Sequence, residues 1–220
     1  MAINNVDALY INELFLSIQG ESSRAGLPCG FIRFAGCNLR CVWCDTAYAF
    51  EGGKEMSPDE ILKVVTQWHI PLVEITGGEP LLQFGCTPLA ELLLEKGHTL
   101  LIETNGTLPI DVLPEGAIRI MDIKCPDSGM SDKIYWPNIE LLNCRDEVKF
   151  VLASRGDYEW ARDVIHRYTL EKRCAAVLLS AVTGDLDAAR LAAWMLEDQL
   201  EARLQLQLHK IIWSSDQRGV

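Results

Sequence analysis

Three cysteines stand close together in the stretch CNLRCVWCDT, at Cys37, Cys41 and Cys44. A loop with this Cys-x3-Cys-x2-Cys spacing can direct three thiolates toward one iron–sulfur centre. On a four-iron, four-sulfur cube, three thiolates leave one iron without a protein ligand, and a small molecule can chelate that iron and accept an electron. The spacing therefore predicts a cluster whose open iron carries out the chemistry.

Three other interpretations of these cysteines stay open. A structural zinc would need a fourth ligand, and the nearest histidines, His69 and His98, are remote in sequence. A plain electron-transfer cluster would normally use a fourth cysteine, which Cys29 or Cys86 could supply. The three thiols could also be packed or redox-active cysteines that hold no metal.

A second signal is the sequence TGGEP at residues 76–80, which follows a predicted strand. Its glycines let a ligand approach the backbone closely after a strand. The carboxylate of Glu79 can accept hydrogen bonds from an ammonium group. Together with the cysteines at the end of the preceding predicted strand, this loop indicates one shared site.

The elements that must position these residues alternate between short apolar runs and amphipathic stretches. Ser57 and Glu60 are spaced as a capping box with Pro58 between them, which predicts a helix start at residue 57; Gly97 predicts a helix end. The predicted helices start at 57 or span 88–96, 158–168 and 185–200, and the predicted strands span 30–34, 72–75, 99–103, 118–123, 147–152, 175–179 and 203–212.

Strands separated by helical segments indicate βαβ units and a parallel sheet. A full eightfold barrel typically needs about 250 residues, and this chain has 220. We therefore expect an α/β fold with a partial, open TIM-like barrel of about six parallel strands, outer helices and a single domain over residues 1–220. A flat doubly wound sheet is the alternative. The polar signals follow the strands, so in either fold they should meet at one rim.

Composition limits the function classes. About half of the residues (49%) are hydrophobic, which supports a buried core. The formal net charge of −11 disfavours nucleic acid as the main partner. We find no signal peptide pattern and no apolar run long enough to span a bilayer, so the sequence predicts no membrane association.

The chain has eight cysteines. With no export signal, this number favours a reducing cytoplasm. The five cysteines outside the triplet stand alone and are interpreted as small buried hydrophobic residues. These are Cys29, Cys86, Cys125, Cys144 and Cys174.

The cysteine triplet together with TGGEP resembles the two signatures of radical S-adenosylmethionine (SAM) enzymes. The resemblance narrows to 7-carboxy-7-deazaguanine synthases through the segments INELF at 11–15, QGE at 19–21, FIR at 31–33, WCDT at 43–46, ETNGT at 103–107 and QLHK at 207–210. These segments extend across nearly the whole chain.

This resemblance implies a radical lyase with a [4Fe-4S] cluster, SAM and Mg²⁺ as cofactors. The implied substrate is 6-carboxy-5,6,7,8-tetrahydropterin. A 5′-deoxyadenosyl radical would remove hydrogen from its C6, and ring contraction with loss of ammonia would give 7-carboxy-7-deazaguanine for queuosine and related deazapurine pathways.

The resemblance also implies roles for single residues. It implies cluster ligation by Cys37, Cys41 and Cys44, and a magnesium ligand in Thr46. It implies SAM contacts from Trp43, Cys44, Asp45, Gly78, Glu79, Asp122, Ile123, Lys124 and Ser180, although relatives often have Ser-Pro-Lys where this chain has Asp122-Ile123-Lys124. It implies substrate contacts from Ile18, Gln19, Gly20, Arg33 and Thr76, and catalytic roles for Glu103 and His209.

The same resemblance implies partners. Flavodoxin or ferredoxin would supply the electron, and relatives are often homodimers. Two other function classes stay open: another small radical SAM enzyme, such as an activase that installs a glycyl radical on a protein, and a non-catalytic iron–sulfur electron carrier.

Overall fold

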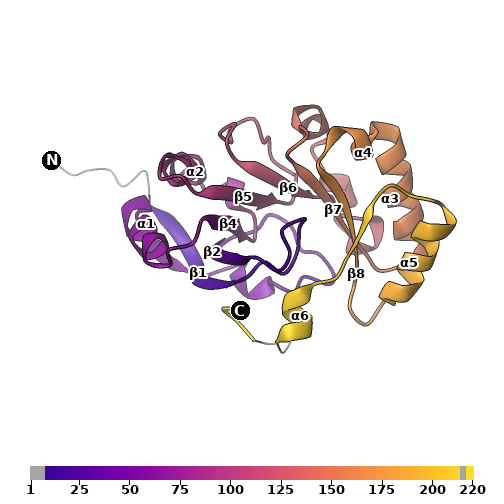
Figure 1. Cartoon of the computed structure of the whole chain (residues 1–220), viewed down its shortest axis with the longest axis horizontal. Helices are drawn as coiled ribbons and strands as arrows, with labels where there is room; N and C mark the ends of the chain where they lie inside the picture. Colours follow the sequence, from indigo (N-terminus) through magenta and orange to yellow (C-terminus); the bar gives the residue numbers. More distant parts are fainter. Residues whose placement is uncertain (1–7, 214–216) are drawn as a thin grey trace.

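The computed structural model describes residues 8–213 and 217–220. Within these ranges the strands form a single curved sheet with the order β3-β1-β2-β4-β5-β6-β7-β8-β9. Figure 1 shows α1 and α2 beside one half of the sheet and α3, α4 and α5 beside the other half. The strands are β1 (Leu9–Ile18), β2 (Pro28–Phe34), β3 (Lys54–Met56), β4 (Leu72–Gly77), β5 (Thr99–Thr104), β6 (Ile118–Asp122), β7 (Glu147–Leu152), β8 (Ala176–Ala181) and β9 (Arg203–Gln205).

Pairing confirms the predicted fold class. From β2 to β9, omitting β3, each described strand pairs with its neighbour in parallel. Strand β1 runs antiparallel to both β2 and β3, and the end strands β3 and β9 are not paired with each other. The sheet is therefore an open, partial barrel. The helices are α1 (Pro58–Gln67), α2 (Cys86–Glu95), α3 (Arg155–Tyr168), α4 (Leu170–Arg173), α5 (Ala188–Glu197) and α6 (Leu208–Ile212).

Successive residues of each strand face opposite sides of the sheet, and the two faces differ. On β2, Ile32 and Phe34 join the large core that includes helix residues such as Leu89 and Ile165. Phe31 lies in a second, smaller cluster on the other face. That inner cluster also contains Cys29, Leu72, Leu101, Ile118 and Ile120, mostly from the first halves of their strands. It forms an apolar floor inside the curved sheet.

The loop between β1 and β2 crosses to the far side of the sheet and closes the end at which the parallel strands begin. Ser22 N donates to Gln205 Oε1 of β9 at 3.0 Å, and Ser23 N donates to Glu147 Oε2, on the first residue of β7, at 2.9 Å. Arg24 forms an ion pair with the same Glu147 at 3.2 Å. The opposite end of the half-barrel is therefore the place for the polar loops.

The capping box predicted for the first helix is present. Ser57 Oγ accepts from Glu60 N, and Ser57 N donates to Glu60 Oε2 at 2.8 Å. Replacing Ser57 by alanine should lower the free energy of unfolding by about 1 kcal/mol, because an exposed helix start loses its side-chain acceptor. Urea denaturation would measure this, and Ser57→Asp, which keeps an acceptor, should retain most of the stability. Equal stability of both variants and the parent chain would contradict the prediction.

The predicted strand at 203–212 is wrong beyond residue 205. After β9 the chain leaves the sheet, because Leu208 N donates to Gly20 O of the β1–β2 loop at 2.9 Å, and a short helix α6 begins. Strands β1 and β3 were not predicted from their patterns. The lone cysteines are buried as expected except for Cys144, which is exposed and corrects that interpretation.

None of the helices in residues 8–213 and 217–220 is long and apolar enough to cross a bilayer.

Candidate active site

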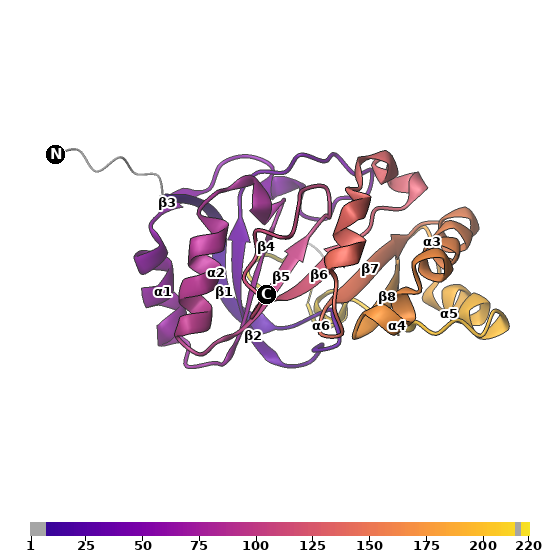
Figure 2. The same ribbon diagram turned by 90° about the horizontal axis from the view of Figure 1, so that it is seen from above.

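A cavity of about 660 Å³ lies inside the curved sheet, above the apolar floor. Its wall comes from the inner faces of the strands, from the cysteine loop after β2 and from residues 217–220. In Figure 1 the C-terminus and helix α6 lie below the strands, and in the view from above in Figure 2 they lie behind the middle strands. Most predicted site residues line this cavity. They are Ile18, Gln19, Gly20, Arg33, Cys37, Cys41, Trp43, Cys44, Asp45, Thr46, Thr76, Gly78, Glu103, Asp122, Lys124 and His209.

The three cysteines of the loop all face this cavity and are half-buried. Within the described ranges, no three His, Cys, Asp or Glu side chains are grouped so that they could hold one metal ion. A zinc ion needs ligands that converge on one point, whereas a four-iron cube offers each thiolate a separate iron. Three free thiols on one loop at a cavity wall are the donor set that a four-iron cube with one open iron uses.

The cysteines considered as a fourth ligand lie elsewhere. Cys29 belongs to the apolar floor, and Cys86 belongs to the outer core at the start of α2. Both are buried and neither lines the cavity. The structure thus does not support a closed cluster with four cysteine ligands drawn from these residues.

The TGGEP loop packs backbone against backbone on the cysteine loop. Glu79 N donates to Gly36 O at 2.8 Å. A Cβ on Gly78 would lie 2.7 Å from Cys37 Cβ and closer still to the carbonyl oxygen of Gly36. The two loops therefore fit together only because residue 78 has no side chain.

Replacing Gly78 by alanine should separate the two loops. We expect a loss of roughly 1–3 kcal/mol in the free energy of unfolding, as for other overpacked sites, together with a lower iron content after reconstitution. Gly156→Ala is the matched control, because a Cβ there meets only Ser154 Oγ at an ordinary 3.5 Å. If Gly78→Ala takes up iron and unfolds like Gly156→Ala, the loops do not depend on this contact.

Glu79 is fully buried and does not line the cavity. Its carboxylate accepts from Leu81 N at 3.0 Å, from Thr104 Oγ1 at 2.9 Å and from Asn105 N at 2.7 Å. Burial raises the pKa of Glu79 to about 7 against the lowering effect of these bonds. In this structure the side chain ties the TGGEP loop to the end of β5.

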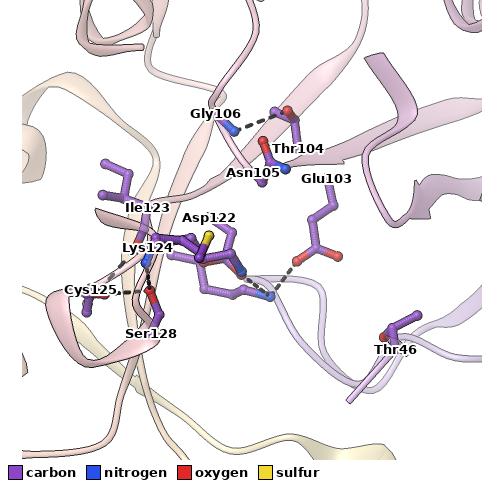
Figure 3. A network of polar contacts seen from close by, with 12 residues as sticks. Thr46, Glu103, Thr104, Asn105, Gly106, Asp122, Ile123, Lys124, Cys125 and Ser128 are labelled. Carbon is purple, nitrogen blue, oxygen red and sulfur yellow. Dashed lines mark hydrogen bonds and ion pairs between the residues drawn. The ribbon is translucent and has the colours of Figure 1, made fainter. Parts of the chain in front are cut away.

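A buried lysine, Lys149 of β7, lies in the middle of the site. Its Nζ contacts Glu21 Oε2 at 2.7 Å, Asp122 Oδ2 at 3.4 Å and Glu103 Oε1. Sequence reasoning missed Lys149 and Glu21 as site residues. For Lys149 a signal was present, because a charged residue in a mostly apolar stretch such as EVKFVL indicates buried charge. Figure 3 shows the side chains of Glu103 and Asp122 in this network, with Thr46 nearby on a separate loop.

The segment after β6 carries a second lysine. Lys124 Nζ donates to Asp122 Oδ2 at 2.8 Å, whereas Asp122 Oδ1 is buried without a hydrogen-bond partner in the described part of the chain. Burial alone would raise the pKa of Asp122, but Lys124 and Lys149 outweigh it and hold that pKa below its usual range. The unpaired Oδ1 and the adjacent ammonium thus offer an acceptor and a donor at the cavity wall.

Besides Glu79, two predicted SAM contacts are not brought to the cavity. Ile123 is buried in the outer core, and Ser180 is buried with its hydroxyl donating to Gln205 O at 3.0 Å. The residues that follow Ser180 do reach the cavity, since Val182 and Thr183 line it.

Arg33 lies at the end of β2 among aromatic rings. Its guanidinium carbon is 5.6 Å from the centre of the Phe15 ring and 6.0 Å from that of Tyr48. Its Nε pairs with Glu13 Oε2 at 2.8 Å, and the Tyr48 hydroxyl donates to the same oxygen. Because the ion pair uses Nε, the remaining guanidinium nitrogens suit an anionic group in the cavity.

Helix α6, predicted as part of a strand, closes the other side of the site. Lys210 Nζ donates to Asp45 Oδ2 at 2.7 Å, and Thr46 Oγ1 donates to Asp45 Oδ1 at 3.0 Å. His209 packs on Gly20, where a Cβ would come within 3.0 Å of His209 Cγ. Burial lowers the pKa of His209, so its neutral form is favoured. Residues 217–220 also line the cavity, and Arg218 stacks 4.0 Å from the Tyr48 ring centre.

Comparison with known proteins shows the family to which the chain is similar. Residues 31–125 match the radical SAM superfamily. The chain is 44% identical to the 7-carboxy-7-deazaguanine synthase of Koribacter versatilis over 96% of this chain and 100% of that one, and 46% identical to that of Chlorobaculum tepidum over 96% and 97%. The crystal structure of QueE from Escherichia coli superposes with a TM-score of 0.73 at 25% identity, over 90% of this chain and 92% of QueE.

Proposed function

The chain belongs to the family of 7-carboxy-7-deazaguanine synthases, and from this premise we propose that it converts 6-carboxy-5,6,7,8-tetrahydropterin to 7-carboxy-7-deazaguanine and ammonia. The observation that carries the proposal is that one cavity is lined by the three cysteines, by Arg33 and by Gln19. The cavity thus combines a cluster site with groups suited to an anionic, bicyclic substrate.

The cofactors follow from the radical SAM family. Cys37, Cys41 and Cys44 would hold a [4Fe-4S] cluster, whose open iron would bind SAM. When bound, cluster and SAM together supply the 5′-deoxyadenosyl radical that removes a hydrogen atom from C6 of the substrate.

SAM would lie beside the same loop. Trp43, Asp45 and Gly78 line the cavity there, and Lys124 with Asp122 offers a donor and an acceptor to its polar groups. In our proposal the closely packed backbone at Gly78 holds the cofactor near the cysteines. Glu79, Ile123 and Ser180, which do not line the cavity, would act by shaping this wall.

The substrate would be held by residues from both ends of β1 and β2. Arg33 would bind the substrate carboxylate, because a guanidinium matches a carboxylate with paired hydrogen bonds. Ile18, Gln19 and Gly20 would contact the edge of the pterin ring. Thr76, which lines the same cavity, would also contact the ring.

Glu103 and His209 would handle protons. Glu103 accepts from Thr76 Oγ1 at 2.9 Å and is bonded to Lys149, which holds its carboxylate in place at the cavity wall. His209, with its lowered pKa, is suited to accept a proton. Thr46 would bind Mg²⁺, which takes few protein ligands and keeps waters and substrate oxygens.

The partners in the proposal are a flavodoxin or ferredoxin as electron donor and a second copy of the chain. All described cysteines are free thiols, which suits the reducing cytoplasm that we propose for this chain. Cross-linking with a reduced flavodoxin and sedimentation of the reconstituted protein would test the two partners separately.

The function itself is tested with anaerobically reconstituted protein. We expect the tetrahydropterin to be consumed, and 7-carboxy-7-deazaguanine to form, only when SAM, a reductant and Mg²⁺ are all present. Unchanged pterin with release of 5′-deoxyadenosine would overturn the substrate while keeping the radical class. An intact, reducible cluster that neither binds SAM nor cleaves it would favour an electron carrier, and co-purification of a large protein with transfer of a radical to it would favour an activase.

A further inference from the structure

The third residue of β4, Glu74, is an acidic side chain that the proposed mechanism does not use. It is 4% exposed, lies on the inner face of the sheet and lines the cavity just above the apolar floor. Within the described residues its carboxyl group has one hydrogen bond, which Oε2 accepts from Gln19 Nε2. Its other oxygen, at a cavity wall, has no partner in this part of the chain.

The surroundings of Glu74 disfavour its charged form. Burial, followed by the neighbouring Glu103, raises the pKa of Glu74 to about 8; Glu21 acts in the same direction, whereas Gln19 and Lys149 act against it. Cys29 of β2, the other titratable group that faces it, is an uncharged thiol because burial raises its pKa. At neutral pH the side chain therefore carries a proton, and it offers an O–H donor beside a carbonyl acceptor.

Such a carboxylic acid is the geometric complement of a lactam, in which an N–H donor stands beside a carbonyl acceptor. The two groups can form a pair of parallel hydrogen bonds in one plane. Aromatic surface lies beside Glu74 in the same cavity: Phe31 is its register partner on β2, and Phe31 stacks on Phe15 at 4.9 Å between ring centres, both rings lining the cavity. A 2-amino-4-oxopyrimidine ring has both features, a lactam edge and a flat face.

We infer that Glu74 is a substrate-recognition residue that hydrogen-bonds the lactam edge of the bicyclic substrate through both oxygens of its side chain, with Gln19 holding it in place. The inference rests on the proposed function, because that function supplies a substrate with a lactam edge. It adds a reason for selecting 2-amino-4-oxo rings over rings that lack an adjacent donor and acceptor.

Equilibrium binding tests the inference without turnover. The cluster-loaded protein is titrated, without reductant, with 6-carboxypterin, which keeps the lactam edge, and binding is followed by its fluorescence. At pH 6.5 we expect Glu74→Leu to bind about 10- to 100-fold more weakly, as loss of paired hydrogen bonds predicts. Glu74→Gln should stay within about threefold of the parent protein, because a primary amide also has a donor beside an acceptor.

The pH dependence separates this role from a structural one. As the pH rises from 6.5 to 9.5, Glu74 loses its proton. The affinity of the parent protein for 6-carboxypterin should then fall about tenfold relative to the affinity of Glu74→Gln, whose amide does not titrate. At each pH the dissociation constant of the parent protein is divided by that of Glu74→Gln, so that any titration of the ligand itself affects both values and cancels. Glu51→Gln, at an exposed position outside the cavity, is the matched control and should follow the parent protein at both pH values.

Three outcomes would overturn the assignment: Glu74→Leu binding as tightly as the parent protein, Glu74→Gln binding as weakly as Glu74→Leu at pH 6.5, or a pH-independent ratio. If Glu74→Leu does not fold, as judged by circular dichroism, the pH dependence of the ratio of dissociation constants between the parent protein and Glu74→Gln still tests the assignment. Turnover of the tetrahydropterin by the parent protein, measured in parallel, reports separately on the proposed function. Parent protein that neither turns over the pterin nor binds 6-carboxypterin would overturn both.

Discussion

Replacing Cys41 by alanine should abolish SAM cleavage. Two thiolates cannot hold a cube that depends on three, so iron should fall from about four per chain to near background after anaerobic reconstitution. The measurements are iron and sulfide content, visible absorption and 5′-deoxyadenosine formed after reduction. We expect the same result for Cys37→Ala and Cys44→Ala, because the three thiols face one cavity.

Cys144→Ser is the matched control for this prediction. Cys144 is the exposed cysteine outside the triplet, so its loss should leave iron content and SAM cleavage unchanged. A Cys41→Ala protein that retains a full cluster would show that another residue supplies a ligand, and the assignment of the triplet would fail.

Replacing Lys149 by methionine should be the most destabilising single change outside the apolar core. It leaves Glu21, Glu103 and Asp122 near one another without the ammonium that contacts all three. Removing one partner from a buried charge network typically costs about 3–5 kcal/mol of unfolding free energy. Urea denaturation measures this loss, and activity should fall with it because Glu103 loses its fixed position.

Lys133→Met is the control, because Lys133 pairs with Asp132 at 2.9 Å on the exposed surface. Exposed pairs contribute about 0–1 kcal/mol, so its stability should hardly change. Lys149→Arg keeps the charge and should retain more stability than Lys149→Met. If Lys149→Met and Lys133→Met unfold at the same urea concentration, the network does not stabilise the fold.

The loss of unfolding free energy in Lys149→Met should depend on pH, because the carboxylates that Lys149 contacts titrate. Burial would raise the pKa values of Glu21 and Asp122, but Lys149 and its neighbours hold both below their usual range. A lowered carboxyl pKa contributes stability that is present above the unfolded-state value of about 4 and is lost as the pH falls through the folded-state value. Compared with the parent protein, the variant should therefore be most deficient near pH 7, and the deficit should shrink below about pH 5.

The sequence predicted the layout of the sheet because its signals are local. Apolar runs between helical segments identified β2 and the strands from β4 to β8, and the capping box at Ser57 located the start of α1. The part of the predicted strand after residue 205 was wrong, because its apolar residues suit a strand, whereas the backbone partner of Leu208 is Gly20, nearly two hundred residues away in the sequence. No local pattern reports such a contact.

Part of the candidate site was likewise predicted from the sequence, and part of it was missed. The cysteine triplet and TGGEP are short, so their spacing alone identifies them, and the cavity brings Arg33, Gln19 and Thr46 to the same space. Lys149, Glu21 and Glu74 were missed because the residues that surround them in the fold are far from them in the sequence. They become site residues only when neighbouring strands bring them together above the apolar floor.

Local sequence patterns predicted the order of β2 and of β4 to β8 with the main helices between them, and the chemistry that three closely spaced thiols permit, since both depend on neighbours in the chain. Only the tertiary structure decided which charges share the cavity and which predicted contacts, such as Ile123 and Ser180, face away from it. The physical reason is that burial and pairing act through space. The direction in which a carboxyl pKa moves, and the partner that a lysine finds, are set by strands that lie side by side in the sheet but far apart in the sequence.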